Sequence, residues 1–168
     1  MRYVVIGFCV FAAACSGAAP TAPTSSLSQI GKGVATTQAK GGTELPFKGT
    51  YEGEEKEPDP SVPSKHHLDA TGIATHLGLF TVTADWTVTG GGPIETSSTW
   101  TAANGDEFHT SFTRSRATLT FTEIHTIHGG TGRFADASGT FTVVQIRALS
   151  TLPSGNTATI DGTISLGH

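Results

Sequence analysis

The stretch Leu79–Thr89 reads LFTVTADWTVT, in which apolar residues alternate with threonine and aspartate. Successive side chains of an extended strand point to opposite faces, so a period of two gathers the apolar side chains on one side. The segment is therefore predicted to be a β-strand with one buried face and one solvent-facing face. The residues predicted on its buried face are Phe80, Val82, Ala84, Trp86 and Val88.

The same alternation recurs from Leu45 onward, and no segment shows the period of a helix. Turn-forming residues separate the alternating segments, and Asn104-Gly105 is the strongest such signal. An Asn-Gly pair there predicts a hairpin with a type I′ turn, which needs positive φ at both central residues. The predicted strands are Leu45–Gly53, Leu68–Thr75, Leu79–Thr89, Glu95–Ala103, Asp106–Thr113, Ala117–Ile127, Gly139–Arg147 and Thr157–Leu166.

Eight strands in a meander leave two unpaired edges, and pairing the first strand with the last removes both. The sequence thus predicts an all-β fold, an eight-stranded antiparallel barrel with a packed or narrow apolar interior. Ionisable side chains are expected to be rare on the inward faces. The segment Glu54–His66, which holds acidic residues and three prolines, is expected to be an exposed excursion between the first two strands.

The chain has 168 residues, of which 14% are charged and 21 are glycine, and its formal net charge is −4. Low charge with abundant glycine and threonine argues against coiled coils and helical bundles and agrees with an all-β protein. The sequence has no cluster of Lys and Arg, which binding to a phosphate backbone requires. Nucleic acid is therefore not an expected partner.

The N-terminus has the features of a secretion signal. Arg2 precedes the apolar run Tyr3–Phe11, which is shorter than the roughly 20 residues that span a bilayer, and small residues lead up to Cys15. This pattern resembles a bacterial lipobox and predicts a signal peptide over residues 1–14 and a lipid on Cys15; ordinary cleavage at a small-residue site is the alternative. Residues 15–43 are expected to form a disordered tether and residues 44–168 the barrel domain.

Removal of the signal peptide would leave Cys15 as the remaining cysteine, so neither a disulfide nor a Cys-ligated metal is expected in the barrel. Ser16 resembles the sorting signal of outer-membrane lipoproteins. The expected location is therefore the bacterial cell envelope, at the outer membrane, where the lipid anchor makes the membrane a partner. A secreted or periplasmic protein is the alternative.

The segment His128–Gly139 reads HGGTGRFADASG. It resembles the glycine motif of allene oxide cyclase-like and dirigent-like barrels, and Thr75–Gly78 and Ala103–Glu107 resemble motifs of their bacterial relatives. The resemblance covers roughly Leu45 to Leu166 and implies an eight-stranded barrel with an apolar cavity, often oligomeric, that shapes a reactive ligand. The residues interpreted as structural scaffold are Gly129, Gly130, Gly132, Arg133, Phe134 and Gly139, with Phe134 as a plug of one barrel end.

Glu123 and His125 are the candidate catalytic residues, because they project from the same side of one strand, about 6.5 to 7 Å apart. A carboxyl group in apolar surroundings has a raised pKa, which suits general acid–base catalysis. Idle, hydrated side chains at the barrel mouth are the alternative. The residues expected to wall a ligand, or simply to form core, are Trp86, Trp100, Tyr51 and Phe121.

The seven histidines include no HxH pair with a clear third ligand, so neither a metal nor a cofactor is expected. Nothing in the sequence places a His and an acid beside one hydroxyl. The leading hypothesis is a membrane-tethered barrel that binds a small apolar ligand or an envelope partner without catalysis. The alternatives are an isomerase or cyclase of an apolar, fatty-acid-like substrate, and a purely structural surface protein.

Overall fold

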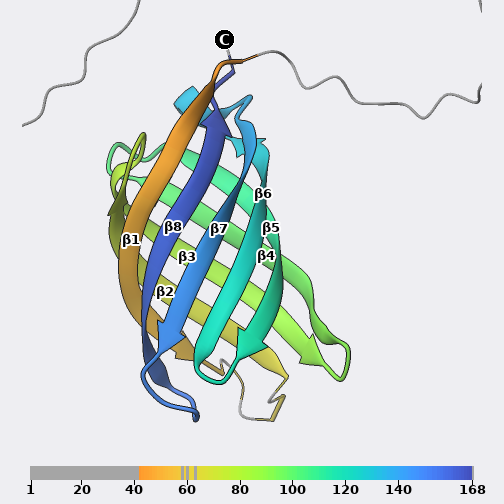
Figure 1. The fold of residues 1–168 in the computed structure, drawn as a ribbon. Helices are drawn as coiled ribbons and strands as arrows, with labels where there is room; N and C mark the ends of the chain where they lie inside the picture. The colour runs from red at the N-terminus through yellow and green to blue at the C-terminus, as the bar shows by residue number, and fades with distance from the viewer. Residues whose placement is uncertain (1–41, 58, 60, 63, 168) are drawn as a thin grey trace, which may run out of the picture. The chain divides into compact units, whose positions relative to one another are not determined.

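The computed structural model describes residues 42–57, 59, 61–62 and 64–167. Its eight strands run antiparallel to their neighbours and form one closed barrel, in which β1 also pairs with β8 (Figure 1). The predicted all-β, eight-stranded antiparallel barrel is confirmed. The elements are β1 (Glu44–Lys56), β2 (Lys65–Ala74), β3 (Gly78–Thr89), β4 (Gly92–Ala102), β5 (Glu107–Ala117), β6 (Thr120–Gly130), the 3-10 helix η1 (Gly132–Phe134), β7 (Ser138–Arg147) and β8 (Ser154–Ser165).

The predicted signal peptide, the lipid site Cys15 and nearly all of the predicted tether lie outside the described residues. In the part of the chain that is described, no helix has the length and apolar character needed to cross a membrane.

The faces of the strands follow the alternation in the sequence. In β3, Phe80, Val82, Ala84 and Trp86 are all buried. Val88, expected on the same face, lies one residue before the end of β3 and is 39% exposed.

Two hairpin turns differ from the expectation. At Asn104-Gly105 the hairpin is present, but only the glycine has positive φ, at 86°, and its N–H donates to the carbonyl of Ala102. The loop is therefore not a type I′ turn. The β5–β6 turn falls at Thr118-Leu119, inside the predicted strand Ala117–Ile127, where Thr118 has a φ of 58°. Neither glycine nor asparagine marks this turn, so the sequence carries no signal for it.

The connection between the first two strands is shorter than the predicted excursion Glu54–His66. β1 continues to Lys56 and β2 begins at Lys65, so the ladder includes residues assigned to a loop. Glu55 pairs with Leu68 on one side and with Ser154 on the other, and its side chain is fully buried inside the barrel.

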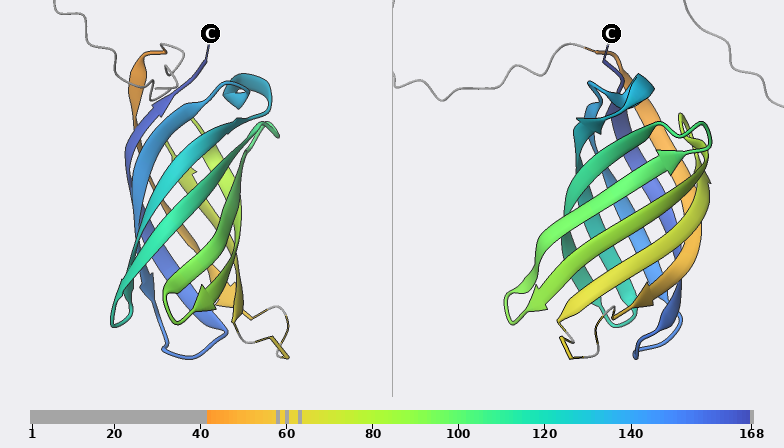
Figure 2. Two further views of the ribbon diagram at one scale, coloured as in Figure 1. Left: turned by 90° about the vertical axis from the view of Figure 1, so that its right-hand side faces the viewer. Right: turned by 180° about the vertical axis from the view of Figure 1, so that it is seen from behind.

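Aromatic rings fill the barrel from its centre to the end at η1. Trp100 packs against Phe108 and Phe141, with ring centroids 5.7 and 5.3 Å apart. Phe134, from η1, lies 5.5 Å from Phe108 and has no exposed surface, so it closes this end. We call the end at Phe134 the closed end. The opposite end, where the β1–β2, β3–β4, β5–β6 and β7–β8 connections lie, is the open end (Figure 2).

Candidate functional site

A pocket of about 660 Å³ lies at the open end of the barrel. Residues from β3, β5 and β6 and from the β7–β8 connection line it. Its volume falls within the range of roughly 300 to 1,000 Å³ that is usual for small-molecule sites. Its apolar lining consists of Val88, Pro93, Phe121 and Leu152.

Three arginine side chains that line this pocket surround the ring of Phe121. The guanidinium carbons of Arg114 and Arg147 both lie 4.7 Å from the ring centroid, and that of Arg116 lies 5.5 Å away. Arg114 is also 4.2 Å from the ring of Trp86, so its guanidinium contacts two aromatic rings. Such cation–π contacts hold the arginine head groups in fixed positions.

Two buried carboxylates face these arginines. Glu55 accepts a hydrogen bond from Arg147 and lies 3.1 Å from Nδ1 of His66. Glu123 accepts a hydrogen bond of 2.6 Å from Nε of Arg114. The charged groups therefore form one network inside the barrel, in which each buried charge has a partner of opposite sign.

Burial raises the pKa of Glu123, but the hydrogen bond with His125 and the charge of Arg114 outweigh burial and hold this pKa below its ordinary value. Burial likewise raises the pKa of Glu55, and the hydrogen bond with His66 and the charge of Arg114 outweigh it. The structure therefore contradicts the expected raised pKa of Glu123. That expectation considered Glu123 in apolar surroundings and did not include Arg114 beside it. Both carboxyl groups are ionised at neutral pH.

A chain of hydrogen bonds leads from Glu123 into the core. His125 Nε2 lies 3.1 Å from Glu123, and its Nδ1 lies 2.8 Å from the Thr110 hydroxyl. That hydroxyl is 2.5 Å from Ser98, which accepts a hydrogen bond from the indole of Trp100. Since an ionised carboxylate can only accept, Nε2 of His125 donates the hydrogen bond to Glu123.

The structure thus places the Thr110 hydroxyl, His125 and Glu123 in a line of hydrogen bonds. The sequence had given no indication of a histidine and an acid beside one hydroxyl. Thr110 and His125 are 3% and 2% exposed, and neither belongs to the lining of the open-end pocket. The Thr110 hydroxyl is already engaged by Ser98 and His125. The arrangement is therefore a satisfied buried network and not an accessible nucleophile.

Six buried side-chain atoms among the described residues have no hydrogen-bond partner. Nearly all buried polar atoms in proteins bond to protein groups or to ordered water. Of the residues that carry these atoms, only Arg147 lines the open-end pocket. The six atoms are Glu55 Oε2, Trp86 Nε1, Gln145 Nε2, Arg147 Nε, and Nδ2 and Oδ1 of Asn156.

The structure brings some of the candidate residues together and separates others. Glu123 and His125 are in direct contact, and Phe121 lines the open-end pocket. Trp86 is buried behind Arg114. Trp100 is a core residue and does not line this pocket. Tyr51 is also buried, and burial raises the pKa of its phenol well above the ordinary value.

The expectation that ionisable groups are rare inside the barrel is wrong. Glu55, Arg114 and Arg147 were missed as inward residues, although Arg147 ends the predicted strand Gly139–Arg147 and continuing the period of two by one step places the other two inward. Glu55 follows Tyr51 at a step of four, and Arg114 follows Phe112 at a step of two. For Glu55 and Arg114 the signal was present, but the predicted strands Leu45–Gly53 and Asp106–Thr113 ended just before them.

The glycines of the family-like segment lie at the closed end. Gly129, Gly132 and Gly139 have φ values of 85°, 52° and 136°, a region that side chains other than hydrogen disfavour. Gly130 lies so close to the carbonyl of Glu107 that a Cβ would not fit. In the same segment, Arg133 stacks 4.8 Å from the ring of Phe134.

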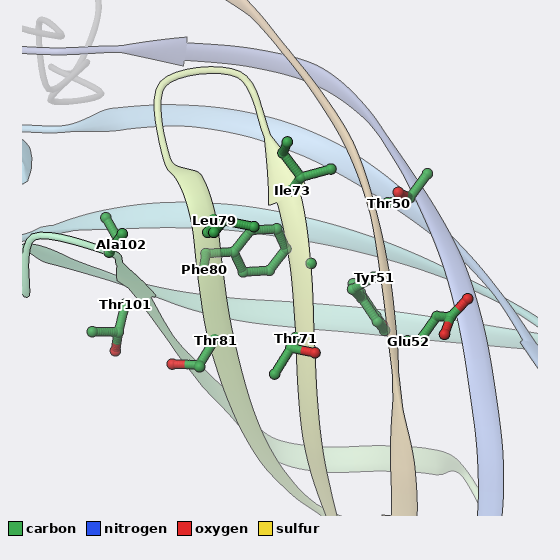
Figure 3. A pocket seen from close by; sticks show the side chains of 12 residues that line it. Thr50, Tyr51, Glu52, Thr71, Ile73, Leu79, Phe80, Thr81, Thr101 and Ala102 are labelled. Atoms are coloured by element: carbon green, nitrogen blue, oxygen red, sulfur yellow. The ribbon is translucent and has the colours of Figure 1, made fainter.

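A second hollow, of about 630 Å³, lies on the outer face of β1, β2 and β3 (Figure 3). Ile73 and Leu79, which pair across the β2–β3 ladder, are 59% and 68% exposed there. None of the unpartnered buried atoms found in the described residues belongs to this hollow. Its chemistry is therefore that of an apolar surface depression.

Within the described residues, no three His, Cys, Asp or Glu side chains converge in a way that would hold a metal ion. His66 faces Glu55 inside the barrel, whereas His67 contacts Asp85 and Asp69 outside it. The two adjacent histidines therefore point to opposite faces, as their positions in a strand require.

The fold and the site together define a closed antiparallel barrel with a charged pocket at one end. Among solved structures, the chain is similar to the pterocarpan synthase dirigent protein GePTS1, with 14% sequence identity and a TM-score of 0.46 over 84% of this chain and 98% of that chain. Comparison with protein-family models gives no match, and comparison with curated proteins gives none either.

Proposed function

We propose that the barrel binds a small organic ligand in its open-end pocket and does not transform it. The observation that carries the proposal is a pocket of about 660 Å³ whose lining combines apolar side chains with three arginines, one of which, Arg147, has an Nε without a hydrogen-bond partner among the described residues. In a barrel with a purely structural role, side chains would be expected to fill the open end, as aromatic side chains fill the closed end.

Binding is favoured over catalysis because the candidate acid and base are already engaged. Glu123 bonds to Arg114 and His125, and its pKa is lowered, whereas a general acid at neutral pH needs a raised pKa. Neither Glu123 nor His125 lines the pocket. The isomerase or cyclase alternative therefore has less support than the binding function.

The proposed cellular setting rests on the sequence. The lipobox-like residues before Cys15 support a lipoprotein of the bacterial envelope, and the glycine segment at Gly129–Gly139 supports membership of the allene oxide cyclase-like and dirigent-like barrels. Replacement of the cysteine by Cys15→Ser is expected to release the protein from the membrane fraction. Retention of the variant in that fraction would contradict lipid anchoring.

Native mass spectrometry of the protein purified from its source tests the binding function. The wild-type protein is expected to carry a bound small molecule. Val88→Trp, which fills the pocket, is expected to lose it, and Val144→Trp is the matched control because this valine is 37% exposed on β7, away from the pocket. Absence of any adduct from the wild type, or equal loading of both variants, would contradict the proposal.

A further inference from the structure

We infer that the ligand of the open-end pocket is an organic anion, with an oxyanion held at Arg116 and Arg147 and an apolar body against Val88, Pro93 and Leu152. The inference rests on the proposed binding function and names the chemical class of its ligand. It is carried by the arginines that line the pocket, by the lack of an ion pair at Arg116 within the described residues, and by the position of the apolar lining.

The buried charges balance one another, and the exposed Arg116 adds a cation at the pocket that lacks a carboxylate partner within the described residues. Three guanidinium groups, those of Arg114, Arg116 and Arg147, surround Phe121, whereas only Glu55 and Glu123 are buried against them. Arg116 is exposed and forms no ion pair within the described part of the chain; its Nε donates to the carbonyl of Thr118. Glu57 is the one carboxylate among the residues that line the pocket, and it lies at the rim.

The unmet hydrogen bonds are mostly those of donors. Of the six unpartnered atoms in the described residues, four are N–H donors, on Trp86, Gln145, Arg147 and Asn156. Of these four residues only Arg147 lines the open-end pocket, and the group that complements a guanidinium is rich in acceptors, as a carboxylate, sulfonate or phosphate is. Arg147 also donates to the buried Glu55, which fixes the position of its guanidinium beside the pocket.

The rest of the pocket favours an apolar body on that anion. Val88, Pro93, Leu152 and the ring of Phe121 line the pocket together with the arginines. A bare inorganic ion would leave these surfaces in contact with water, whereas an organic acid covers them. The guanidinium of Arg116 faces the ring of Phe121 and its Nε donates to the Thr118 carbonyl, which leaves its terminal N–H groups for a planar oxyanion.

The test compares two fluorescent probes on the full-length protein. Anilinonaphthalenesulfonate carries a sulfonate, and phenylnaphthylamine has the same ring system without it. The wild-type protein is expected to bind the sulfonate probe at least about tenfold more tightly, as charge-assisted hydrogen bonds predict. Added salt is expected to weaken binding of the sulfonate probe and to leave the neutral probe unaffected.

Arg116→Gln is the decisive variant, and Arg133→Gln is its matched control. Both arginines stack on a phenylalanine, Arg116 on Phe121 at the open end and Arg133 on Phe134 at the closed end. Arg116→Gln is expected to lower the ratio of the affinities for the sulfonate and the neutral probe by about tenfold, and Arg133→Gln is expected to leave this ratio unchanged. Arg116→Lys, which keeps the charge, is expected to restore part of the preference.

The outcomes separate the two proposals. Equal affinity for both probes, or an equal effect of the two glutamine variants, overturns the anion subsite and leaves ligand binding standing. Failure of the wild type to bind either probe, with no bound molecule in native mass spectrometry, overturns both. Thermal unfolding of each variant shows whether its barrel is intact, and Arg116 is exposed enough for the fold to tolerate its replacement.

Discussion

The two ends of the barrel each hold a phenylalanine beneath arginine, but they differ in what lies behind it. At the closed end, Phe134 packs on Phe108, and Arg133 lies outside, 3.8 Å from Asp106. At the open end, Phe121 is surrounded by arginines whose partners are buried carboxylates. The closed end is filled by packed aromatic rings with its arginine outside, whereas the open end holds charges that have been taken out of water. Burial of charge costs stability, so its presence at one end alone is an argument for function.

Because the two ends are packed differently, replacing the phenylalanine by alanine is predicted to lower the free energy of unfolding by different amounts at each end. Phe134→Ala is expected to lower the free energy of unfolding by about 3 to 5 kcal/mol, because it opens a cavity in close-packed core. Phe121→Ala is expected to cost at least about 1 kcal/mol less, because water already reaches the pocket beside this ring. Denaturant unfolding measures both. Equal losses would mean that the two ends are equally well packed.

The next largest loss of unfolding free energy is expected when one charge is removed at the open end. Arg114→Leu leaves Glu55 and Glu123 without a shared cation and is expected to cost about 3 kcal/mol of unfolding free energy. Adding Glu123→Gln to this variant is expected to recover part of the loss, because it removes one of the uncompensated charges. An additive double-mutant cycle would show that the two side chains do not interact.

Acid has a smaller effect, and it is confined to the open end. The pKa values of Glu55 and Glu123 are lowered in the folded protein from an ordinary value of 4.5. Their stabilisation is therefore complete above that value and is lost as the pH falls below it, through the folded-state pKa values. Unfolding free energies measured from pH 7 to pH 3 are expected to fall less steeply in Glu123→Gln. An identical slope in this variant would remove Glu123 from the titration.

The sequence predicts the closed end better than the open end, for a physical reason. An apolar interior repeats a simple alternation, which identified the strands and the inward face of β3. At the open end the inward positions are Glu55, Arg114 and Arg147, which interrupt the apolar pattern and so resemble loop residues. Parity alone identifies such residues, and it requires knowing where each strand ends.

The hydrophobic pattern of a single strand cannot show which side chains on other strands will be its ion-pair partners. Arg147 and Glu55 are far apart in the sequence and meet only because β1 closes on β8, which in turn pairs with β7. The lowered pKa of Glu123 likewise depends on Arg114 in the neighbouring strand, at the paired position. The candidate pair Glu123 and His125 was found from spacing alone, but its chemistry was set by neighbours that spacing does not reveal.

The two tryptophans offer the most direct test, since each reports on one region. The indole N–H of Trp86 is unpartnered behind the open-end pocket, whereas that of Trp100 is bonded to Ser98 in the core. In a two-dimensional NMR titration of the protein with anilinonaphthalenesulfonate, the Trp86 indole signal is expected to shift and saturate while the Trp100 signal stays in place. A shift of the Trp100 signal with the Trp86 signal unchanged, or no shift of either, would contradict ligand binding at the open end.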